Sequence, residues 1–256
     1  MKREGHLMGI LEIDIGNSRI KWRRFADDRK VVISRGINLD INGFLAEQAN
    51  HEKPSAVRLS NVSDSKISSK IADWVGVKWN IQPTAAVVCA ECSGVKIQYK
   101  DVSRLGVDRW LAMLAAFNQS NGPCLILDSG TAFTLDVIDE EGLHLGGFIL
   151  PGLGLMRESL VSKTGIRLEN QVLEPTLELG NSTQEAVFNG GVASLVALAQ
   201  KEIEEQRKKG FKPNVFITGG DASLLNDLLA YPMSQIEEDL VLDGLSLGCH
   251  GKSGSD

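Results

Sequence analysis

Two short segments of the sequence each place an aspartate before a glycine and small polar side chains. The first is Asp14-Ile-Gly-Asn-Ser, which interrupts a strand-like apolar run, and the second is Asp128-Ser-Gly-Thr. Glycine lets backbone N–H groups approach an anion closely, and a hydroxyl group adds a donor. A carboxylate repels phosphate unless Mg²⁺ lies between them, so the pair predicts a nucleotide phosphate site. Asp and Gly are also ordinary turn residues, and only the repetition favours function.

A third segment, Gly106-Val-Asp-Arg, opens a predicted helix and allows two interpretations. Asp108 could orient a substrate hydroxyl group and accept its proton, while Arg109 could hold a substrate carboxylate or neutralise developing charge. Alternatively, Asp108 only favours the helix N-terminus and pairs there with Arg109. The residues alone leave both interpretations open.

The first half of the chain predicts alternating strands and helices around these segments. Val107, Trp110, Leu111, Leu114 and Phe117 share one face of the helix that follows Gly106. The elements expected are strands at 9–15, 19–25, 31–37, 55–62 and 84–90, and helices at 40–53, 63–76 and 106–117.

The second half predicts a similar succession. Ser182 and Glu185 form a capping-box pattern that opens a long helix ending near 209. Gly190 and Gly191 lie inside this helix, which predicts that another backbone approaches there. The elements expected are strands at 124–128, 132–138, 143–150 and 214–218, and a first helix at 152–165.

Both halves therefore begin with an Asp-led turn between the first two of three strands. We interpret this as an internal duplication, although two unrelated hairpins would also give two such turns. The predicted fold is α/β with two related lobes, residues 8–117 and 118–250, joined through the polar stretch 118–123. Residues 1–7 and 251–256 are expected to be flexible ends, with Met8 an alternative start.

Composition excludes several classes of protein. The net charge is −6 and there is no long basic run, which argues against nucleic acid as a partner. The apolar stretches are interrupted and strand-sized, so no membrane span is expected, and residues 1–6 lack the apolar core of an export signal. A cytoplasmic location is therefore expected.

Two further patterns are more easily explained by structure than by chemistry. Cys89 and Cys92 form a CxxC, but no second pair or histidine cluster completes a zinc site, so reduced thiols are expected. His144 lies on a predicted strand and is expected to be a core or surface histidine.

Six segments in order along the chain resemble the type III pantothenate kinase family: DIGNS, GVDR, DSGTAFT, GGFILPG, NSTQEAV and TGGDA. The resemblance covers almost the whole chain outside its ends. It implies the superfamily of acetate and sugar kinases, heat-shock chaperones and actin, with two duplicated ribonuclease H-like lobes around an ATP cleft. Ser18, where many members have Thr, and Ser129, at a variable position, are its small departures.

The resemblance also implies roles for residues. Asp108 would be the general base for the primary hydroxyl of pantothenate, and Asp14 would position Mg²⁺-ATP, directly or through water. Asp128 would serve the monovalent cation, K⁺ or NH₄⁺. The implied ATP-binding residues are Asp14, Gly16, Asn17, Ser18, Lys21, Gly130, Thr131 and Thr134. The implied pantothenate-binding residues are Tyr99, Gly106, Asp108, Arg109 and Thr183, the last reaching in from the second subunit of a homodimer.

The function expected is therefore ATP-dependent phosphorylation of pantothenate to 4′-phosphopantothenate, the first step of coenzyme A biosynthesis. One alternative is a catalytically weak family member that serves as an accessory factor in transcription; degenerate motifs would support it, and the motifs are intact. Another is a kinase of the same superfamily that acts on a different small hydroxy acid or sugar.

Overall fold

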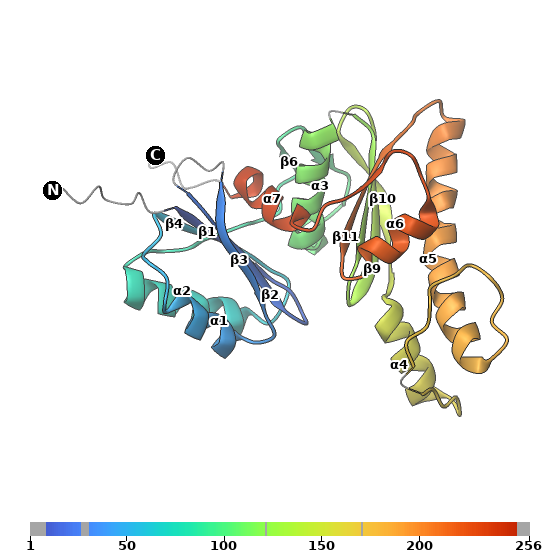
Figure 1. The fold of residues 1–256 in the computed structure, drawn as a ribbon. Helices are drawn as coiled ribbons and strands as arrows, with labels where there is room; N and C mark the ends of the chain where they lie inside the picture. Colours follow the sequence, from blue (N-terminus) through green and yellow to red (C-terminus); the bar gives the residue numbers. More distant parts are fainter. Residues whose placement is uncertain (1–8, 27–30, 121, 170, 250–256) are drawn as a thin grey trace. The chain divides into compact units, whose positions relative to one another are not determined.

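The computed structural model describes residues 9–26, 31–120, 122–169 and 171–249. These residues form two compact units, each built around a sheet (Figure 1). The first unit holds the described residues up to Ser93, Tyr99–Ala115 and those from Val241 onward. The second holds Gly94–Gln98 and Ala116–Leu240. The predicted flexible ends and Met8 lie outside the described residues.

The first sheet has five strands in the order β3-β2-β1-β4-β5. They are β1 (Ile10–Ile15), β2 (Ile20–Phe25), β3 (Val32–Asn38), β4 (Ala56–Asn61) and β5 (Thr84–Ala85). The first three strands are antiparallel, whereas β4 runs parallel to β1 and β5 parallel to β4. Leu11, Ile13 and Ile15 alternate along β1, so one face of the sheet is apolar and packs with α1 (Ile41–Gln48) and α2 (Ser65–Trp79).

The second sheet has seven strands in the order β12-β11-β8-β9-β10-β7-β6. They are β6 (Glu91–Cys92), β7 (Val95–Ile97), β8 (Cys124–Ser129), β9 (Ala132–Ile138), β10 (Leu143–Pro151), β11 (Asn214–Gly219) and β12 (Ser234–Ile236). Strands β8, β9 and β10 are antiparallel neighbours, and β11 and β12 continue the sheet in parallel with β8.

Five strands of the second sheet repeat the whole of the first. The order β10-β9-β8-β11-β12 matches β3-β2-β1-β4-β5, and every pair has the same relative direction. Two unrelated hairpins would not share the parallel crossovers after the third strand, so the duplication predicted from the two Asp-led turns is confirmed. The chain is a mixed α/β protein with two related sheets flanked by helices.

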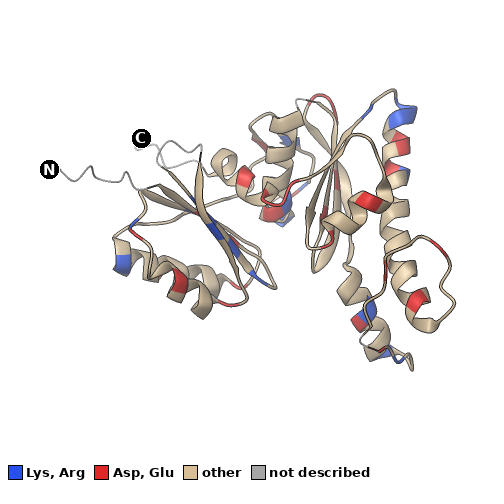
Figure 2. Cartoon of the chain, in the orientation of Figure 1, with Lys and Arg blue, Asp and Glu red and all other residues tan. Residues whose placement is uncertain are grey.

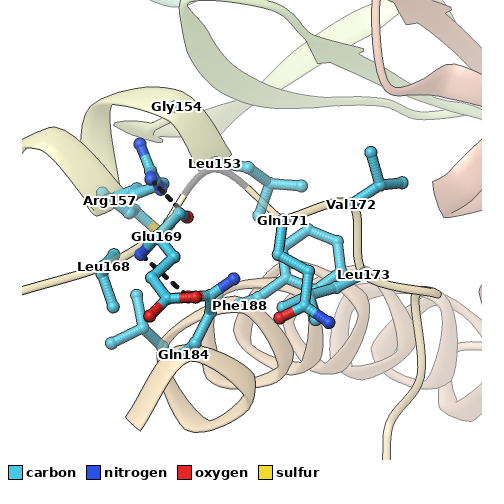
Figure 3. A pocket seen from close by; sticks show the side chains of 13 residues that line it. Leu153, Gly154, Arg157, Leu168, Glu169, Gln171, Val172, Leu173, Gln184 and Phe188 are labelled. Atoms are coloured by element: carbon cyan, nitrogen blue, oxygen red, sulfur yellow. Dashed lines mark hydrogen bonds between the residues drawn. The ribbon is translucent and has the colours of Figure 1, made fainter.

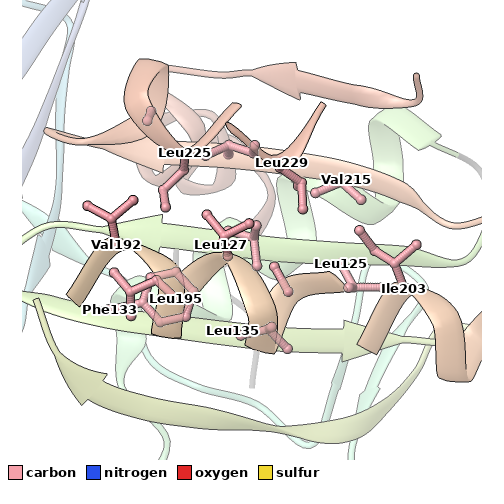
Figure 4. Packing of buried hydrophobic residues seen from close by; sticks show 14 of the residues in the cluster. Leu125, Leu127, Phe133, Leu135, Val192, Leu195, Ile203, Val215, Leu225 and Leu229 are labelled. Carbon is pink, nitrogen blue, oxygen red and sulfur yellow. The ribbon is translucent and has the colours of Figure 1, made fainter. Parts of the chain in front are cut away.

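The core of the second unit lies between its sheet and two helices, α5 (Thr183–Lys208) and α6 (Ala222–Leu229), as Figure 4 shows. Val192, Leu195 and Val196 are buried on one face of α5, at the i, i+3, i+4 spacing of an amphipathic helix. Each buried Val or Leu side chain of this kind contributes about 1.5–3 kcal/mol. The opposite side of the last α5 turns carries exposed pairs such as Lys208–Glu205, and Figure 2 shows both charges interspersed there.

Three predicted boundaries are wrong. The strand expected at 84–90 is only Thr84–Ala85, because residues 86–89 form no ladder beyond the bond from Ala86 N to Leu59 O. The helix expected at 40–53 ends at Gln48, where turn bonds at Asn50 and His51 replace the helical ladder. The helix expected at 63–76 continues to Trp79, and Asn80 ends it in the left-handed conformation.

The helix predicted at 106–117 is α3 (Val107–Ser120), which follows a short 3-10 turn, η1 (Val102–Arg104). It extends into the expected boundary at 118–123 and ends at Ser120, whereas the two units divide within the helix, between Ala115 and Ala116. The unpredicted elements are β6, β7, β12 and α7 (Leu240–Gly248). From Val241 onward, α7 belongs to the first unit although it follows the last strand of the second sheet.

The backbone contact predicted at Gly190 and Gly191 inside α5 is not observed. A Cβ on Gly191 would meet the side chains of Leu153 and Met156 in α4 (Leu153–Lys163), at 3.2 and 3.5 Å. Side chains of the neighbouring helix, not another backbone, therefore pack against Gly191. A Cβ on Gly190 would meet nothing within 4 Å. Over the described ranges, no helix is both long enough and apolar enough to span a membrane.

Candidate functional site

Asp14 lies at the end of β1, immediately before the predicted turn. Its Oδ1 accepts a hydrogen bond of 2.9 Å from Ser60 Oγ on the neighbouring parallel strand β4. The turn is closed by a bond of 3.1 Å from Gly16 N to Arg19 O, which leaves Asn17 and Ser18 exposed at its tip. Lys21 is the antiparallel partner of Asp14 on β2. The sequence therefore builds a hairpin tip that carries a carboxylate, an amide and a hydroxyl group.

The start of α3 explains why glycine precedes Asp108 by two residues. A Cβ on Gly106 would lie 2.6 Å from Oδ1 of Asp108, so any larger residue would displace the carboxylate. The same Oδ1 accepts a hydrogen bond of 2.7 Å from the backbone N–H of Arg109. The carboxylate, which is half-buried, thus lies at the positive end of a 14-residue helix.

Arg109 is buried and its side chain points to a second predicted residue. The guanidinium Nη1 donates a hydrogen bond of 3.2 Å to the hydroxyl oxygen of Tyr99, which precedes η1. Only 8% of Arg109 is exposed, and a buried guanidinium needs several acceptors. The structure therefore brings together Tyr99 and Arg109 beside Gly106 and Asp108, which are four of the five predicted pantothenate-binding residues.

Asp128 occupies the corresponding strand end in the second unit. It is the register partner of Thr134 on β9 and of Thr218 on β11. Gly219, at φ +95°, follows Thr218, and a Cβ there would lie 2.7 Å from Asp128 Oδ1 and 2.3 Å from the carbonyl oxygen of Ser129. Only glycine fits this position, because the backbone conformation and the space both exclude a side chain.

The turn after Asp128 is also in close contact with backbone from elsewhere in the second unit. Gly152 N donates to Thr131 O at 3.0 Å, and a Cβ on Gly152 would lie 2.1 Å from Gly130 O. Ser129 Oγ donates to Asp221 Oδ2 at 3.2 Å, which ties the turn to the start of α6. The turn is thus held from both sides while Gly130 and Thr131 stay exposed.

This second turn fits the phosphates of a nucleotide. Because Gly219 has no side chain, its backbone lies against the turn, and backbone N–H groups of such a turn can approach an anion. Among the described residues, no cluster of three or more His, Cys, Asp or Glu could hold a metal ion. A divalent ion would therefore depend on one or two carboxylates plus phosphate oxygens and water, which is the usual arrangement for Mg²⁺.

Thr183, the fifth predicted substrate residue, is the first residue of α5 and is exposed. Half of the predicted capping box forms here: Ser182 Oγ accepts from Glu185 N at 3.2 Å, whereas the Glu185 carboxylate accepts from Asn181 N at 2.7 Å, one residue before the N-cap. Next to Thr183, Gln184 lines a cavity of about 340 Å³ between α4, α5 and the connecting segment (Figure 3). Gln184 also accepts a hydrogen bond of 2.9 Å from Glu169 N.

The remaining patterns are structural, as predicted. His144 and Asp136 are both buried and 2.8 Å apart across β9 and β10, which makes His144 a core histidine. Cys89 and Cys92 are free thiols, and Cys92 Sγ contacts the carbonyl oxygen of Leu247 at 3.5 Å. Burial raises the pKa of Cys124 to about 12 and that of Cys249 to about 11.

The structure thus sorts the predicted residues into two groups. Asp14, with its turn, and the Tyr99–Asp108–Arg109 group belong to the first unit, whereas the Asp128 turn and Thr183 belong to the second. Sequence reasoning missed Ser60 and Thr218, the hydroxyl residues beside the two aspartates. Each ends an apolar strand, but that signal is too common to identify them without the register.

Two solved structures with low sequence identity to this chain have a similar fold, and the two proteins have different names. A protein named as a Baf family transcriptional activator from Campylobacter jejuni superposes with a TM-score of 0.62 at 21% identity, covering 92% of this chain and 95% of the other. A protein named as a 2-dehydro-3-deoxygalactonokinase from Sinorhizobium meliloti superposes with a TM-score of 0.54 at 11% identity, covering 93% of this chain and 97% of the other. These likenesses show the fold alone.

The sequence, rather than the fold, shows the family. The pattern of the type III pantothenate kinase family matches residues 10–205. The type III pantothenate kinase of Pseudomonas fluorescens strain Pf0-1 is 40% identical over 248 residues, and that of Pseudomonas putida strain W619 is 37% identical over 247; each alignment covers 94% of this chain and 98% of the relative. The chain belongs to the type III pantothenate kinase family, whose members use ATP and a divalent metal to phosphorylate pantothenate in coenzyme A biosynthesis. The regulatory alternative receives no support from the family.

Proposed function

We propose that Asp108 is the general base of this kinase and that Arg109 and Tyr99 hold the substrate pantothenate beside it. The observation that carries the proposal is the start of α3, where Gly106 makes room for the Asp108 carboxylate and buried Arg109 reaches Tyr99. A carboxylate within hydrogen-bond reach of the primary hydroxyl would orient it and take its proton during phosphoryl transfer. A guanidinium suits the carboxylate of pantothenate because it can make two parallel hydrogen bonds.

The two Asp-led turns are proposed to bind Mg²⁺-ATP. Asp14 would position the metal and phosphates, directly or through water, with Gly16, Asn17, Ser18 and Lys21 close to it in its hairpin. Gly130, Thr131 and Thr134 would contribute from the second unit. This rests on the chemistry of the two tips, where hydroxyl, amide and glycine backbone donors surround one carboxylate each.

Asp128 is proposed to bind the monovalent cation, K⁺ or NH₄⁺. Its Oδ1 lies beside the position where Gly219 lacks a side chain, and Thr218 and Thr134 are its strand partners. Oxygen atoms of this kind suit a singly charged ion, which would help to neutralise the triphosphate.

A homodimer is proposed, with Thr183 reaching pantothenate in the second subunit. The support comes from α4, which has no buried residue, so that Leu155, Leu160 and Val161 are all at least 36% exposed. A helix with apolar residues on every side normally packs against something, and a second copy of the chain would cover it. A cytoplasmic location is also proposed, since the cysteines of the described residues are all free.

The Asp108→Asn variant tests the proposed base. The amide has the same shape but cannot accept a proton, so we expect kcat to fall by about 10²- to 10⁴-fold with a native fold by circular dichroism. Unchanged kcat would remove Asp108 from the role. Running wild-type enzyme with K⁺ and then with Na⁺ alone tests Asp128 separately: turnover that is indifferent to the cation would remove that assignment.

A further inference from the structure

Helix α7 and helix α3 touch through their backbones. A Cβ on Gly244 of α7 would lie 2.2 Å from the carbonyl oxygen of Leu111 in α3, and one on Gly248 would lie 2.7 Å from the side chains of Leu111 and Trp110. Both helices at this contact belong to the first unit, and Figure 1 shows them side by side. Contact this close is possible only without side chains, so Gly244 sets how near α3 can approach α7.

The residue before Gly244 fixes α7 to the first sheet. Asp243 Oδ1 accepts a bond of 2.5 Å from Arg23 Nη1, and Arg23 Nε donates to Glu12 Oε2 at 2.8 Å. Arg58 Nη1 donates to the other oxygen of Glu12 at 3.1 Å. Glu12 and Arg23 are almost completely buried, and hydrogen-bonded ion pairs in such surroundings are strongly directional.

These ion pairs connect α7 to this face of the sheet across a cavity. Glu12, Arg23, Arg58 and Asp243 line a cavity of about 580 Å³, so side chains do not fill the space between the helix and the strands. Glu12 lies two residues before Asp14 on β1, and residues two apart in a strand face the same side. Helix α7 is therefore bonded to Arg23 on β2, which in turn bonds Glu12 on the strand that carries Asp14, and α7 is packed on the helix that carries Asp108.

We propose that Gly244 and Asp243 are positioning residues, which set the place of Asp108 relative to the strand that ends in Asp14. Leu111 follows Asp108 by three residues, less than one helical turn, so a displaced backbone at Leu111 carries the carboxylate with it. Relieving the contact of a new Cβ at Gly244 requires a shift of roughly 1 Å, and misplacements of that size can cost about 10²-fold in rate. The proposal rests on the proposed role of Asp108.

The test compares two glycine-to-alanine variants in helices of the same unit. Gly244→Ala should lower kcat by about 10- to 100-fold and leave the KM for ATP within about twofold. Gly76→Ala is the control: it lies in α2, where a Cβ would meet nothing within 4 Å, and it should keep wild-type kcat. Asp243→Asn adds no bulk and weakens only the bond to Arg23, so it should lower kcat several-fold.

A double-mutant cycle with Asp108→Asn separates positioning from general damage. If Gly244 acts through Asp108, Gly244→Ala should have little further effect on kcat once the carboxylate is gone. An equal loss in both backgrounds, or wild-type kcat for Gly244→Ala, would overturn the proposal. If Gly244→Ala does not fold, Asp243→Asn takes its place in the same measurements. Wild-type kcat for Asp243→Asn, or an equal loss of kcat with and without Asp108→Asn, would then overturn the proposal. Wild-type kcat for Asp108→Asn would instead refute the proposed base, whatever Gly244→Ala does.

Discussion

Asp14 and Asp128 occupy equivalent positions in the two sheets. Each is the fifth residue of a six-residue strand whose other members are buried, and each pairs with a hydroxyl residue on the adjacent parallel strand, Ser60 or Thr218. The equivalence explains the repeated Asp-x-Gly pattern, because both copies of the duplicated unit keep a carboxylate at the same strand end. What differs is the glycine beside Asp128, since Gly219 follows Thr218 whereas Asn61 follows Ser60.

Replacing Arg109 by Lys should weaken pantothenate binding. One ammonium group cannot reproduce the two parallel hydrogen bonds of a guanidinium, and in this buried position a lost bond to a charged group costs about 1.5–3 kcal/mol. We expect the KM for pantothenate to rise by about 10- to 100-fold, measured by ADP release at saturating ATP. A normal KM for pantothenate would exclude Arg109 from contact with the substrate.

Neighbouring glycines after β11 should differ sharply in their tolerance of alanine. Gly219→Ala places a Cβ 2.3 Å from Ser129 O at a φ of +95°, and the left-handed backbone alone costs about 1–2 kcal/mol. We expect a lower midpoint of urea unfolding and a higher KM for ATP. Gly220→Ala, where nothing lies within 4 Å, is the matched control and should change neither. Equal behaviour of the two variants would contradict the close contact of Gly219 with the turn after Asp128.

Substitutions of two adjacent residues at the start of α5 should have different effects, one on the stability of the protein and the other on pantothenate binding. Ser182→Ala removes the N-cap bond to Glu185 N and should lower the free energy of unfolding by about 0.5–2 kcal/mol. Thr183→Ala leaves that bond in place, so we expect unchanged stability but a higher KM for pantothenate. A wild-type KM for Thr183→Ala in an enzyme that sediments as a dimer would remove Thr183 from the substrate site.

Buried thiols should resist alkylation until the chain unfolds. Because burial raises the pKa of Cys124 to about 12, only about one thiol in ten thousand is ionised at pH 8, and the thiolate is the reactive form. The thiolate fraction grows as pH rises toward that pKa. Iodoacetamide at pH 8, followed by peptide mass spectrometry, should therefore leave Cys124 and Cys249 unmodified in native protein and label both in urea. Rapid labelling of native Cys124 would contradict its burial.

The sequence predicted the repeated strands of this structure better than the contacts between segments that are distant in sequence. Periodicity located the strands that carry Asp14 and Asp128 within a residue or two, since buried strands end where the pattern breaks at glycine. It could not locate α7, whose Gly244 is explained only by its contact with Leu111, distant in sequence. The hydrogen bonds from Arg23 to Asp243 and Glu12 could not be predicted either, because the sequence pattern does not indicate that charged residues on a strand are buried.

The same limit applies to the candidate site, where residues in local motifs were predicted but their partners on neighbouring strands were not. Asp108 and Arg109 could be named from their spacing and from the family resemblance, but Ser60 depended on strand register. Lys21 and Thr134 became partners of the two aspartates only when the antiparallel pairing was known. Local chemistry is readable from a sequence, whereas the neighbours that orient it come from tertiary contacts.

The most direct test of the central claim is ADP release by the purified wild-type enzyme with Mg²⁺-ATP, K⁺ and increasing pantothenate. We expect ADP release to saturate with pantothenate and one 4′-phosphopantothenate to form for each ADP, with both reactions nearly abolished in Asp108→Asn. ADP release that does not depend on pantothenate, or a folded enzyme that forms no phosphopantothenate, would contradict the proposed function.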